Sequence, residues 1–178
     1  MPNWCEGNLR LRGTRAAILE FIKNEIEVVG HPKGLGIKSF VEGPSSCSPE
    51  ILDEYGEVTV KVPEPAKDWV FLSMYIKGTR RNFIETRNDF YIYLIDEVET
   101  EDVQQTVCID NFKAAWGFEA QPYVEKAKKY GIDIKIVGFE RGMEFAQIIE
   151  IVGGELIKDQ EIKFDDWNWE CVMPNMGG

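Results

Sequence analysis

The sequence lacks the cysteine and histidine patterns that mark a metal site or a disulfide-stabilised fold. It has a single histidine, His31, and no C-x-x-C pair, because its four cysteines stand far apart at Cys5, Cys47, Cys108 and Cys171. Zinc sites and disulfide frameworks both need closer or more regular spacing. We therefore predict no metal, no cofactor and reduced, mostly buried thiols, as expected in a reducing cytoplasm.

Long apolar segments are also absent. No run approaches the roughly 20 residues that a membrane-spanning helix requires, and the first residues lack the basic and apolar regions of a secretory leader. Positive charge is scarce too, because 20 lysines and arginines oppose 31 acidic residues and leave a net charge of −11. Such a charge repels phosphate backbones and anionic lipids. We expect a cytoplasmic protein, with no membrane partner and with nucleic acid disfavoured as a ligand.

What the chain does contain is the composition of a globular protein. Apolar residues make up 44% of its 178 residues and charged residues 29%, which is enough to bury a core in one domain or in two small halves. Residues 96–102 hold five carboxylates that should stay in contact with water. We place an acidic linker there, between an N-terminal half at 1–97 and a C-terminal half at 103–178, with the halves packed into one compact unit.

Hydrophobic periodicity predicts the elements of each half. Alternation over residues 5–12 indicates a strand, and Thr14 can cap a helix whose apolar residues recur at helical spacing up to Val29. The second half predicts β-α-β-β-β, with a helix over residues 122–131 that starts at a proline and ends at a glycine. The pair Gly153-Gly154 between two β-rich runs predicts a tight hairpin.

Three segments of the first half have weaker patterns. Ser48-Pro49-Glu50 can open one helical turn, and residues 70–77 fit a helix or a strand equally. Residues 89–96 are apolar on both faces, which is typical of a central strand. Runs of strands with about one main helix per half predict an α+β fold with mainly antiparallel sheets.

Several short motifs at the start of the chain and in its second half carry a resemblance to a known family. They are Met1-Pro2-Asn3-Trp4-Cys5 with Asn8, Leu9 and Gly13, then Ala115-Trp116-Gly117, Pro122, Glu140-Arg141-Gly142-Met143-Glu144-Phe145-Ala146 and Gly153-Gly154. In these motifs the chain resembles the YubB-type ferredoxin-like family of uncharacterised phage, prophage and conjugative-plasmid proteins. The resemblance implies a ferredoxin-like α/β sandwich and a mobile-element context in a bacterial host, and it implies no activity.

A cluster of basic residues is the main candidate for a binding surface. Aromatic side chains are interleaved with it, and the two sets comprise Lys77, Arg80, Arg81 and Arg87 with Tyr75, Phe83, Tyr91 and Tyr93. Aromatic rings on an open sheet, flanked by arginines, stack bases and hold phosphates in many ferredoxin-like folds. The alternative is ordinary packing, in which the tyrosines lie in the core beneath a helix.

Trp167-Asn168-Trp169 is the second candidate surface. Acidic residues flank this segment on both sides, so exposed Trp167 and Trp169 rings would dock a partner or a second copy of the chain as a homo-oligomer. The alternative is that both rings are architectural and pack in the core.

The sequence suggests no catalytic residues, because His31 has no partner in a recognisable motif. Our leading hypothesis is a non-enzymatic phage or plasmid protein that binds a host or phage macromolecule through the face or edge of its sheet. One alternative is a nucleic-acid-binding module or small enzyme that uses the surface of Arg80, Arg81, Arg87, Tyr91 and Tyr93. Another is an acidic DNA mimic, which would occupy a host DNA-binding protein by presenting carboxylates in place of phosphates.

Overall fold

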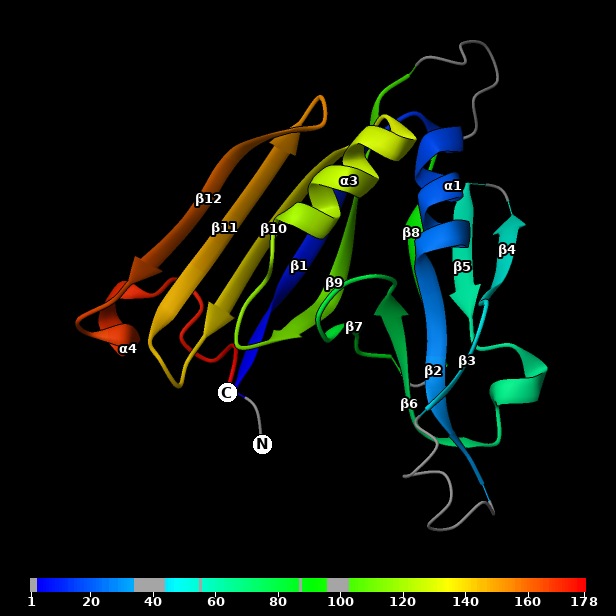
Figure 1. The fold of residues 1–178 in the computed structure, drawn as a ribbon, viewed down its shortest axis with the longest axis horizontal. Helices are drawn as coiled ribbons and strands as arrows, with labels where there is room; N and C mark the ends of the chain where they lie inside the picture. The colour runs from blue at the N-terminus through cyan, green and yellow to red at the C-terminus, as the bar shows by residue number, and fades with distance from the viewer. Residues whose placement is uncertain (1–2, 34–43, 55, 87, 96–102) are drawn as a thin grey trace.

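The computed structural model describes residues 3–33, 44–54, 56–86, 88–95 and 103–178. Within them the chain forms two antiparallel sheets and two main helices, so the predicted α+β class with mainly antiparallel sheets is confirmed (Figure 1). The larger sheet has the order β12 (Glu155–Lys163), β11 (Phe145–Val152), β10 (Asp133–Glu140), β1 (Trp4–Gly13), β9 (Gln105–Ala115), β7 (Asn82–Ile84), β6 (Trp69–Ile76), β2 (Ile26–Pro32) and β3 (Ser45–Cys47). The smaller sheet has the order β4 (Glu50–Glu54), β5 (Glu57–Lys61) and β8 (Asp89–Tyr93).

The two main helices each connect strands of the larger sheet that run in the same direction. α1 (Arg15–Glu25) joins β1 to β2, and α3 (Gln121–Tyr130) joins β9 to β10. Neighbouring strands are antiparallel, so β1 and β2 are parallel to each other although β9, β7 and β6 lie between them. β9 and β10 are likewise parallel, with β1 between them. The larger sheet therefore contains two interleaved β-α-β units.

Strand β1 connects the two predicted halves of the chain. It is hydrogen-bonded on one side to β9 and on the other to β10, although it comes from residues 1–97 and both neighbours come from residues 103–178. One sheet consequently contains strands from both halves. The acidic linker predicted at 96–102 lies outside the described residues.

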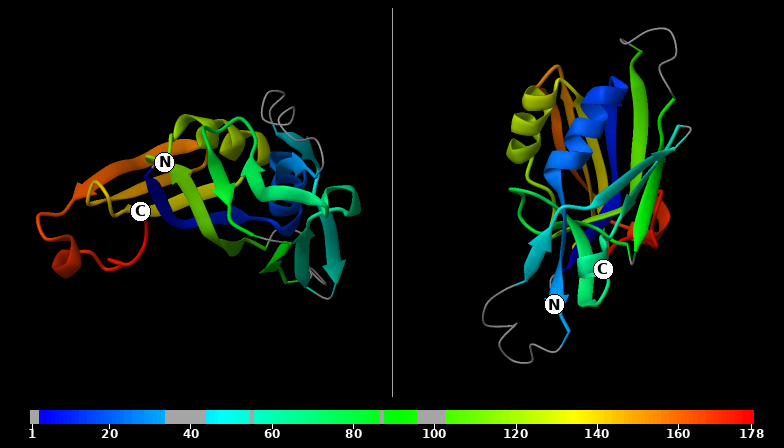
Figure 2. Two further views of the ribbon diagram at one scale, coloured as in Figure 1. Left: turned by 90° about the horizontal axis from the view of Figure 1, so that it is seen from below. Right: turned by 90° about the vertical axis from the view of Figure 1, so that its right-hand side faces the viewer.

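Both main helices lie on one face of the larger sheet (Figure 2). Alternate residues of β1 point to the two faces: Leu9 and Leu11 are fully buried under the helices, whereas Arg10 and Arg12 are exposed on the opposite side. The buried residues join those of α1, such as Phe21, in the main core. We call the two sides of the sheet the helix-covered face and the open face.

Local sequence explains most of the helix ends. The Thr14 hydroxyl caps α1 by accepting a hydrogen bond from a backbone N–H of the first turn at 3.2 Å, as predicted. Gly131 ends α3 with a φ of 64°, a left-handed conformation that glycine adopts readily. The expectation that the first helix continues to Val29 was wrong, because α1 ends at Glu25. From Ile26 onward the β-branched residues pair with β6 instead.

Strand pairing determines the secondary structure of the three segments with weaker patterns. Residues 70–76 belong to strand β6, and residues 50–54 form β4, so the expected helical turn there was wrong. The expectation of a central strand at 89–96 was also wrong, because β8 lies at an edge of the smaller sheet. The hairpin at Gly153-Gly154 is confirmed, with φ values of 59° and 77°.

The smaller sheet extends the core beside β9. The Gln105 side chain, at the start of β9, accepts from the Ile95 N–H at 2.7 Å and donates to the Ile95 carbonyl at 3.0 Å, whereas the other end of β9 pairs with β7. The inward-facing Val58, Val60 and Ile92 are buried in the same core as the helices. β7 and β8 therefore belong to different sheets, although they follow each other in the sequence.

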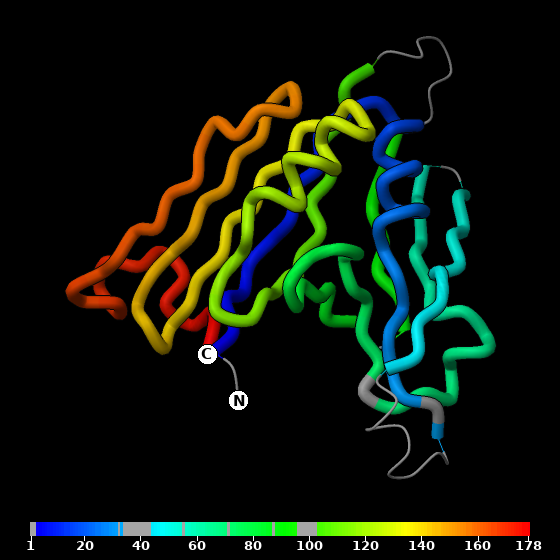
Figure 3. The backbone as a smooth tube through the Cα atoms, in the orientation of Figure 1, coloured from blue at the N-terminus to red at the C-terminus, as the bar shows by residue number. Residues whose placement is uncertain are grey.

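The C-terminal segment covers one end of the open face. The short helix α4 (Trp167–Glu170) contributes Trp167 to a second core cluster with Phe139 of β10 and Ala146 of β11. Gly178 exchanges two backbone hydrogen bonds with Trp4, at 3.2 and 3.1 Å, so the end of the chain lies beside the start of β1 (Figure 3). The rest of the open face of β1 stays accessible.

Candidate functional site

The predicted basic and aromatic residues do not form one surface. Arg80 and Arg81 lie in the turn between β6 and β7, whereas Tyr91 and Tyr93 lie on β8 in the other sheet. The two tyrosines are 61% and 68% exposed, with ring centroids 5.9 Å apart. The alternative that they are core residues beneath a helix was therefore wrong, and they are also not part of the surface around the arginines.

Lys77 adds nothing to the surface around these arginines. The Lys77 ammonium donates to the carbonyl of Asn24 at 2.9 Å, at the end of α1, so its charge is directed to the helix terminus. Arg87 lies outside the described residues. Of the predicted basic residues that the structure describes, Arg80 and Arg81 stand together.

Arg80 and Arg81 meet a tryptophan that the sequence did not assign to the site. The indole of Trp116 is 52% exposed, and its ring centroid lies 5.6 Å from the guanidinium carbon of Arg80 and 5.8 Å from that of Arg81. Arg80 also lies 3.7 Å from a carboxylate oxygen of Glu119. Cation–π attraction of this kind contributes about 0.5–1 kcal/mol at exposed sites. We call Arg80, Arg81, Trp116 and Glu119 the Trp116 cluster.

The backbone of this cluster has an uncommon conformation. Arg81 and Trp116 have φ values of 53° and 64°, in the left-handed region that bulky side chains rarely adopt. The Arg81 carbonyl accepts from the Ala115 N–H at 3.3 Å, and the Trp116 N–H donates to the Asn3 carbonyl at 2.9 Å. Each such residue costs about 1–2 kcal/mol. Strained backbone conformations of this kind are concentrated at functional sites of proteins.

The loop after Trp116 is anchored by one glutamine. The Gln147 side chain, from β11, accepts from the Phe118 N–H at 2.8 Å and donates to the Phe118 carbonyl at 2.9 Å. The Phe118 ring is buried and stacks on Phe112 of β9, with ring centroids 5.1 Å apart. The exposed indole is therefore supported by a loop that the core holds in place.

Three half-buried aromatic residues of the open face lie next to the Trp116 cluster. Phe83 contacts Trp4 and Tyr75, with ring centroids 6.0 and 5.5 Å away. The Lys113 ammonium lies 4.9 Å from the centroid of the Trp4 ring. We call Trp4, Phe83 and Tyr75 the aromatic row. It adjoins the cluster, since Trp4 directly follows the residue that accepts a hydrogen bond from Trp116.

Strand register brings the aromatic row together. Lys113 of β9 is opposite Glu6 of β1 on one side and Phe83 of β7 on the other, and Phe83 is opposite Tyr75 of β6. β1, β7 and β9 are far apart in the sequence, which is why sequence reasoning missed Trp4 and Trp116 as site residues. The Trp-Gly pair directly after a strand was the available signal for Trp116.

The cavities beside these groups are small and open to solvent. One of about 240 Å³ is lined by Tyr75, Phe83 and Glu27, and one of about 260 Å³ by Trp116 and Arg80 with neighbouring loop residues. Pockets for drug-sized molecules usually have about 300–1,000 Å³. The arrangement suits a ligand that lies across the surface better than one enclosed by the protein.

Cys5, Cys47 and Cys108 are poorly suited to nucleophilic chemistry. Burial, together with nearby Glu140, raises the pKa of the Cys5 thiol to about 12. Burial also raises the pKa values of the Cys47 and Cys108 thiols. A protonated thiol is a weak nucleophile. Within the part of the chain that the structure describes, no group of three or more His, Cys, Asp or Glu side chains is arranged to hold a metal ion.

The second predicted surface is divided between core and solvent. Trp167 is 3% exposed, and its indole N–H donates to the carbonyl of Pro174 at 2.8 Å. Trp169 is 86% exposed, and Val172, three residues further along the chain, is 81% exposed. The expectation of two exposed rings was therefore wrong for Trp167, and only Trp169 is free to contact a partner or a second copy.

No protein-family model matches this chain, and no curated protein or solved structure is similar to it at a significant level. The resemblance to the YubB-type family thus stays a prediction that depends on the short motifs. Among the described residues, no helix has the length and apolar character needed to cross a membrane.

Proposed function

We propose that this chain is a non-enzymatic binding protein that holds a macromolecule against the Trp116 cluster and the aromatic row. The observation that supports this function is the exposed Trp116 indole, which two arginines flank on a strained but anchored backbone. Exposed tryptophan and arginine side chains are the residue types that contribute most to binding energy at interfaces.

We also propose that the core of the larger sheet is ferredoxin-like. The support is the pair of interleaved units, β1-α1-β2 and β9-α3-β10, with both helices on one face. In this interpretation β6 and β7 are inserted between β9 and β2, and β11 and β12 extend the sheet beyond β10. The phage or plasmid context rests on the sequence resemblance alone.

Single-stranded nucleic acid is the ligand class that one specific observation favours. Cationic groups lie over aromatic rings here, Arg80 and Arg81 over Trp116 and Lys113 over Trp4, and bases stack on such rings while arginines hold phosphates. The net charge of −11 opposes this ligand at long range, so binding would depend on the local surface. The DNA-mimic hypothesis stays a prediction, because the acidic run at 96–102 lies outside the described residues.

Capture experiments test the proposed surface. We expect the immobilised full chain to retain a specific macromolecule from a bacterial host lysate, and Trp116→Ala with Arg80→Ala to abolish that retention. Trp169→Ala is the matched control, because it removes an exposed indole elsewhere. Retention that survives loss of Trp116 and Arg80 contradicts the proposed function.

A direct titration tests the nucleic-acid candidate. Fluorescence anisotropy of labelled single-stranded RNA and DNA at low salt should show saturable binding that weakens as salt is added. Wild-type protein that binds neither oligonucleotide at low salt rules out this ligand class and leaves a protein partner as the macromolecule to be found.

A further inference from the structure

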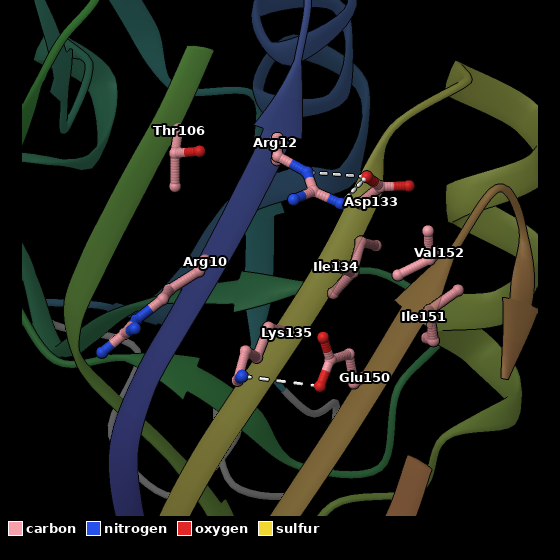
Figure 4. Close-up of a pocket in the computed structure, with 9 residues that line it drawn as sticks. All are labelled: Arg10, Arg12, Thr106, Asp133, Ile134, Lys135, Glu150, Ile151 and Val152. Atoms are coloured by element: carbon pink, nitrogen blue, oxygen red, sulfur yellow. Dashed lines mark hydrogen bonds and ion pairs between the residues drawn. The ribbon is translucent and has the colours of Figure 1, made fainter. Parts of the chain in front are cut away.

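A separate group of cations lies on the open face, away from the Trp116 cluster. Arg10 and Arg12 of β1 and Lys135 of β10 point to this face and surround a cavity of about 190 Å³ (Figure 4). Asp133 and Glu150 also line the cavity, as does Thr106 of β9. Three cations therefore face two carboxylates, which leaves a local excess of positive charge on a strongly acidic protein.

Strand register places two of these cations directly opposite each other. Arg10 is the cross-strand neighbour of Lys135 in the β1–β10 pair. Like charges at directly opposite positions are destabilising in antiparallel sheets. Figure 4 shows that the two side chains diverge, Arg10 toward β9 and Lys135 toward Glu150 on β11. An anion between them would replace repulsion with attraction.

The third cation is oriented by a carboxylate. Two nitrogens of the Arg12 guanidinium lie 2.8 and 2.5 Å from one oxygen of Asp133, and the other Asp133 oxygen accepts from the Gly153 N–H at 2.8 Å. This arrangement fixes the guanidinium plane and turns its remaining nitrogen toward the side of the cavity where Thr106 lies (Figure 4). Arg12 is therefore positioned before any ligand arrives.

The ion pair between Lys135 and Glu150 is the weak point of the cluster. Its atoms are 3.4 Å apart, and the side chains are 40% and 36% exposed. Exposed pairs of this kind contribute about 0–1 kcal/mol, so the ammonium can leave Glu150 for a stronger anion at little cost. Lys135 is thus available to join Arg10 on one ligand, while the Arg10 Nε–H donates to the Asn8 side chain at 3.1 Å.

We infer that this cavity is a phosphate-binding site, in which Arg10, Arg12 and Lys135 hold the oxygens of a phosphate group and the Thr106 hydroxyl donates a further hydrogen bond. Guanidinium groups match the geometry of phosphate oxygens and bind them through charge-assisted hydrogen bonds. The ligand is either a free phosphate compound or the backbone of a nucleic acid. This site stands independently of the proposed function.

The position of the cavity relates it to the aromatic row. Both lie on the open face of β1, and Arg10 is six residues from Trp4, which corresponds to about 20 Å along a strand. A nucleic acid strand that reached both would stack bases at one end and place a phosphate at the other. A free phosphate compound would occupy the cavity alone.

The test is a titration of the full-length protein with inorganic phosphate and pyrophosphate at constant ionic strength, followed by NMR shifts of backbone amides on β1 and β10. We expect saturable shifts around Arg10, Arg12 and Lys135, and a rise in the thermal midpoint of unfolding with ligand. The double variant Arg10→Gln with Lys135→Gln should weaken binding at least about tenfold, because it removes two charged donors.

Lys158→Gln is the matched control. Lys158 of β12 lies in the same cross-strand row as Lys135 and Glu150, so it removes a cation from the same face outside the cavity. We expect it to change the affinity less than about twofold. Absence of saturable shifts in the wild type, or equal weakening by Lys158→Gln and by the double variant, would overturn the inference.

An oligonucleotide arm identifies the source of the phosphate. If an eight-nucleotide single strand binds more tightly than pyrophosphate and Trp116→Ala weakens only the oligonucleotide, a nucleic acid backbone is the ligand. If phosphate and pyrophosphate bind but the oligonucleotide does not, the site takes free phosphate compounds. The second outcome supports the phosphate site and counts against the nucleic-acid candidate, so the two can fail separately.

Discussion

The two faces of the larger sheet are built from alternate residues of the same strands, yet they have opposite chemistry. On the helix-covered face, Leu9 and Leu11 of β1 are fully buried in an apolar core. On the open face, Arg10 and Arg12 are exposed and face other charged groups. The comparison teaches that one face supplies stability and leaves the other free to carry binding residues, because side chains alternate along a strand.

An ion-pair group at the helices can be compared with one on the open face, because their surroundings differ. Buried Glu25, at the end of α1, accepts from Lys126 and Lys129 at 2.9 Å and from the Tyr130 hydroxyl at 2.6 Å. These bonds tie α1 to α3. Burial alone would raise the Glu25 pKa, but hydrogen bonds from Lys129, Tyr130 and Lys126 outweigh it and lower the pKa to about 2. Arg12 and Asp133 form the counterpart on the open face, in contact with water.

The largest loss in the free energy of unfolding is expected from Glu25→Ala, on the helix-covered face. The variant leaves the Lys126 ammonium, which is only 12% exposed, without its partner, and breaking a buried pair costs about 3–5 kcal/mol. Urea unfolding measures the loss. Glu20→Ala, at an exposed position of the same helix, should cost less than about 0.5 kcal/mol. Equal losses for the two variants would remove the distinction.

The stability contributed by the Glu25 carboxylate should also depend on pH. A folded pKa of about 2 lies below the ordinary glutamate value of about 4.3, so the stability it contributes is present above about pH 4.3 and is lost as the pH falls through 2. The shift corresponds to about 3 kcal/mol. Urea midpoints measured between pH 5 and 2 should fall less steeply in Glu25→Gln than in the wild type. Parallel slopes would contradict the assignment.

A smaller effect is expected from Tyr123→Phe, on the buried side of α3. The Tyr123 hydroxyl donates to the side-chain oxygen of buried Asn82 at 2.6 Å. Removing the donor leaves a buried oxygen unsatisfied, at a cost of about 1–3 kcal/mol. Tyr91→Phe, on the exposed outer face of β8, is the control and should leave the free energy of unfolding within about 0.5 kcal/mol of wild type.

The smallest effect belongs to the open face. Arg12→Gln breaks a closer ion pair than any at Glu25, yet Arg12 is 53% exposed and such pairs contribute about 0.2–1 kcal/mol. We expect a loss of less than about 1 kcal/mol in urea unfolding at low salt, and almost none at high salt. A loss as large as that of Glu25→Ala would show that the open face also determines stability.

Elements whose signals are local could be predicted. The capping threonine at residue 14, the helix ended by Gly131 and the Gly153-Gly154 hairpin all depend on residues close in sequence, and all are present. The end of α1 could not be predicted, since the apolar residues after Glu25 fit helical and strand spacing equally. Only their pairing with β6 decides between the two.

The candidate site could be predicted only in part. Arg80 and Arg81 were found because they are adjacent in a basic segment, whereas Tyr91 and Tyr93 were placed with them because they are near in sequence. The structure puts these tyrosines in the other sheet and brings in Trp116 and its neighbours through the pairing of β1, β9 and β7.

The sequence by itself determined the class of fold and the inward or outward direction of side chains such as Leu11 and Arg12, because capping and alternation act between near neighbours. Only the tertiary structure decided which outward residues meet. Arg12 and Asp133 are 121 residues apart, and Trp116, after β9, meets Arg80 and Arg81, before the neighbouring strand β7. Such contacts are set by strand register, which depends on how the whole sheet packs against its helices.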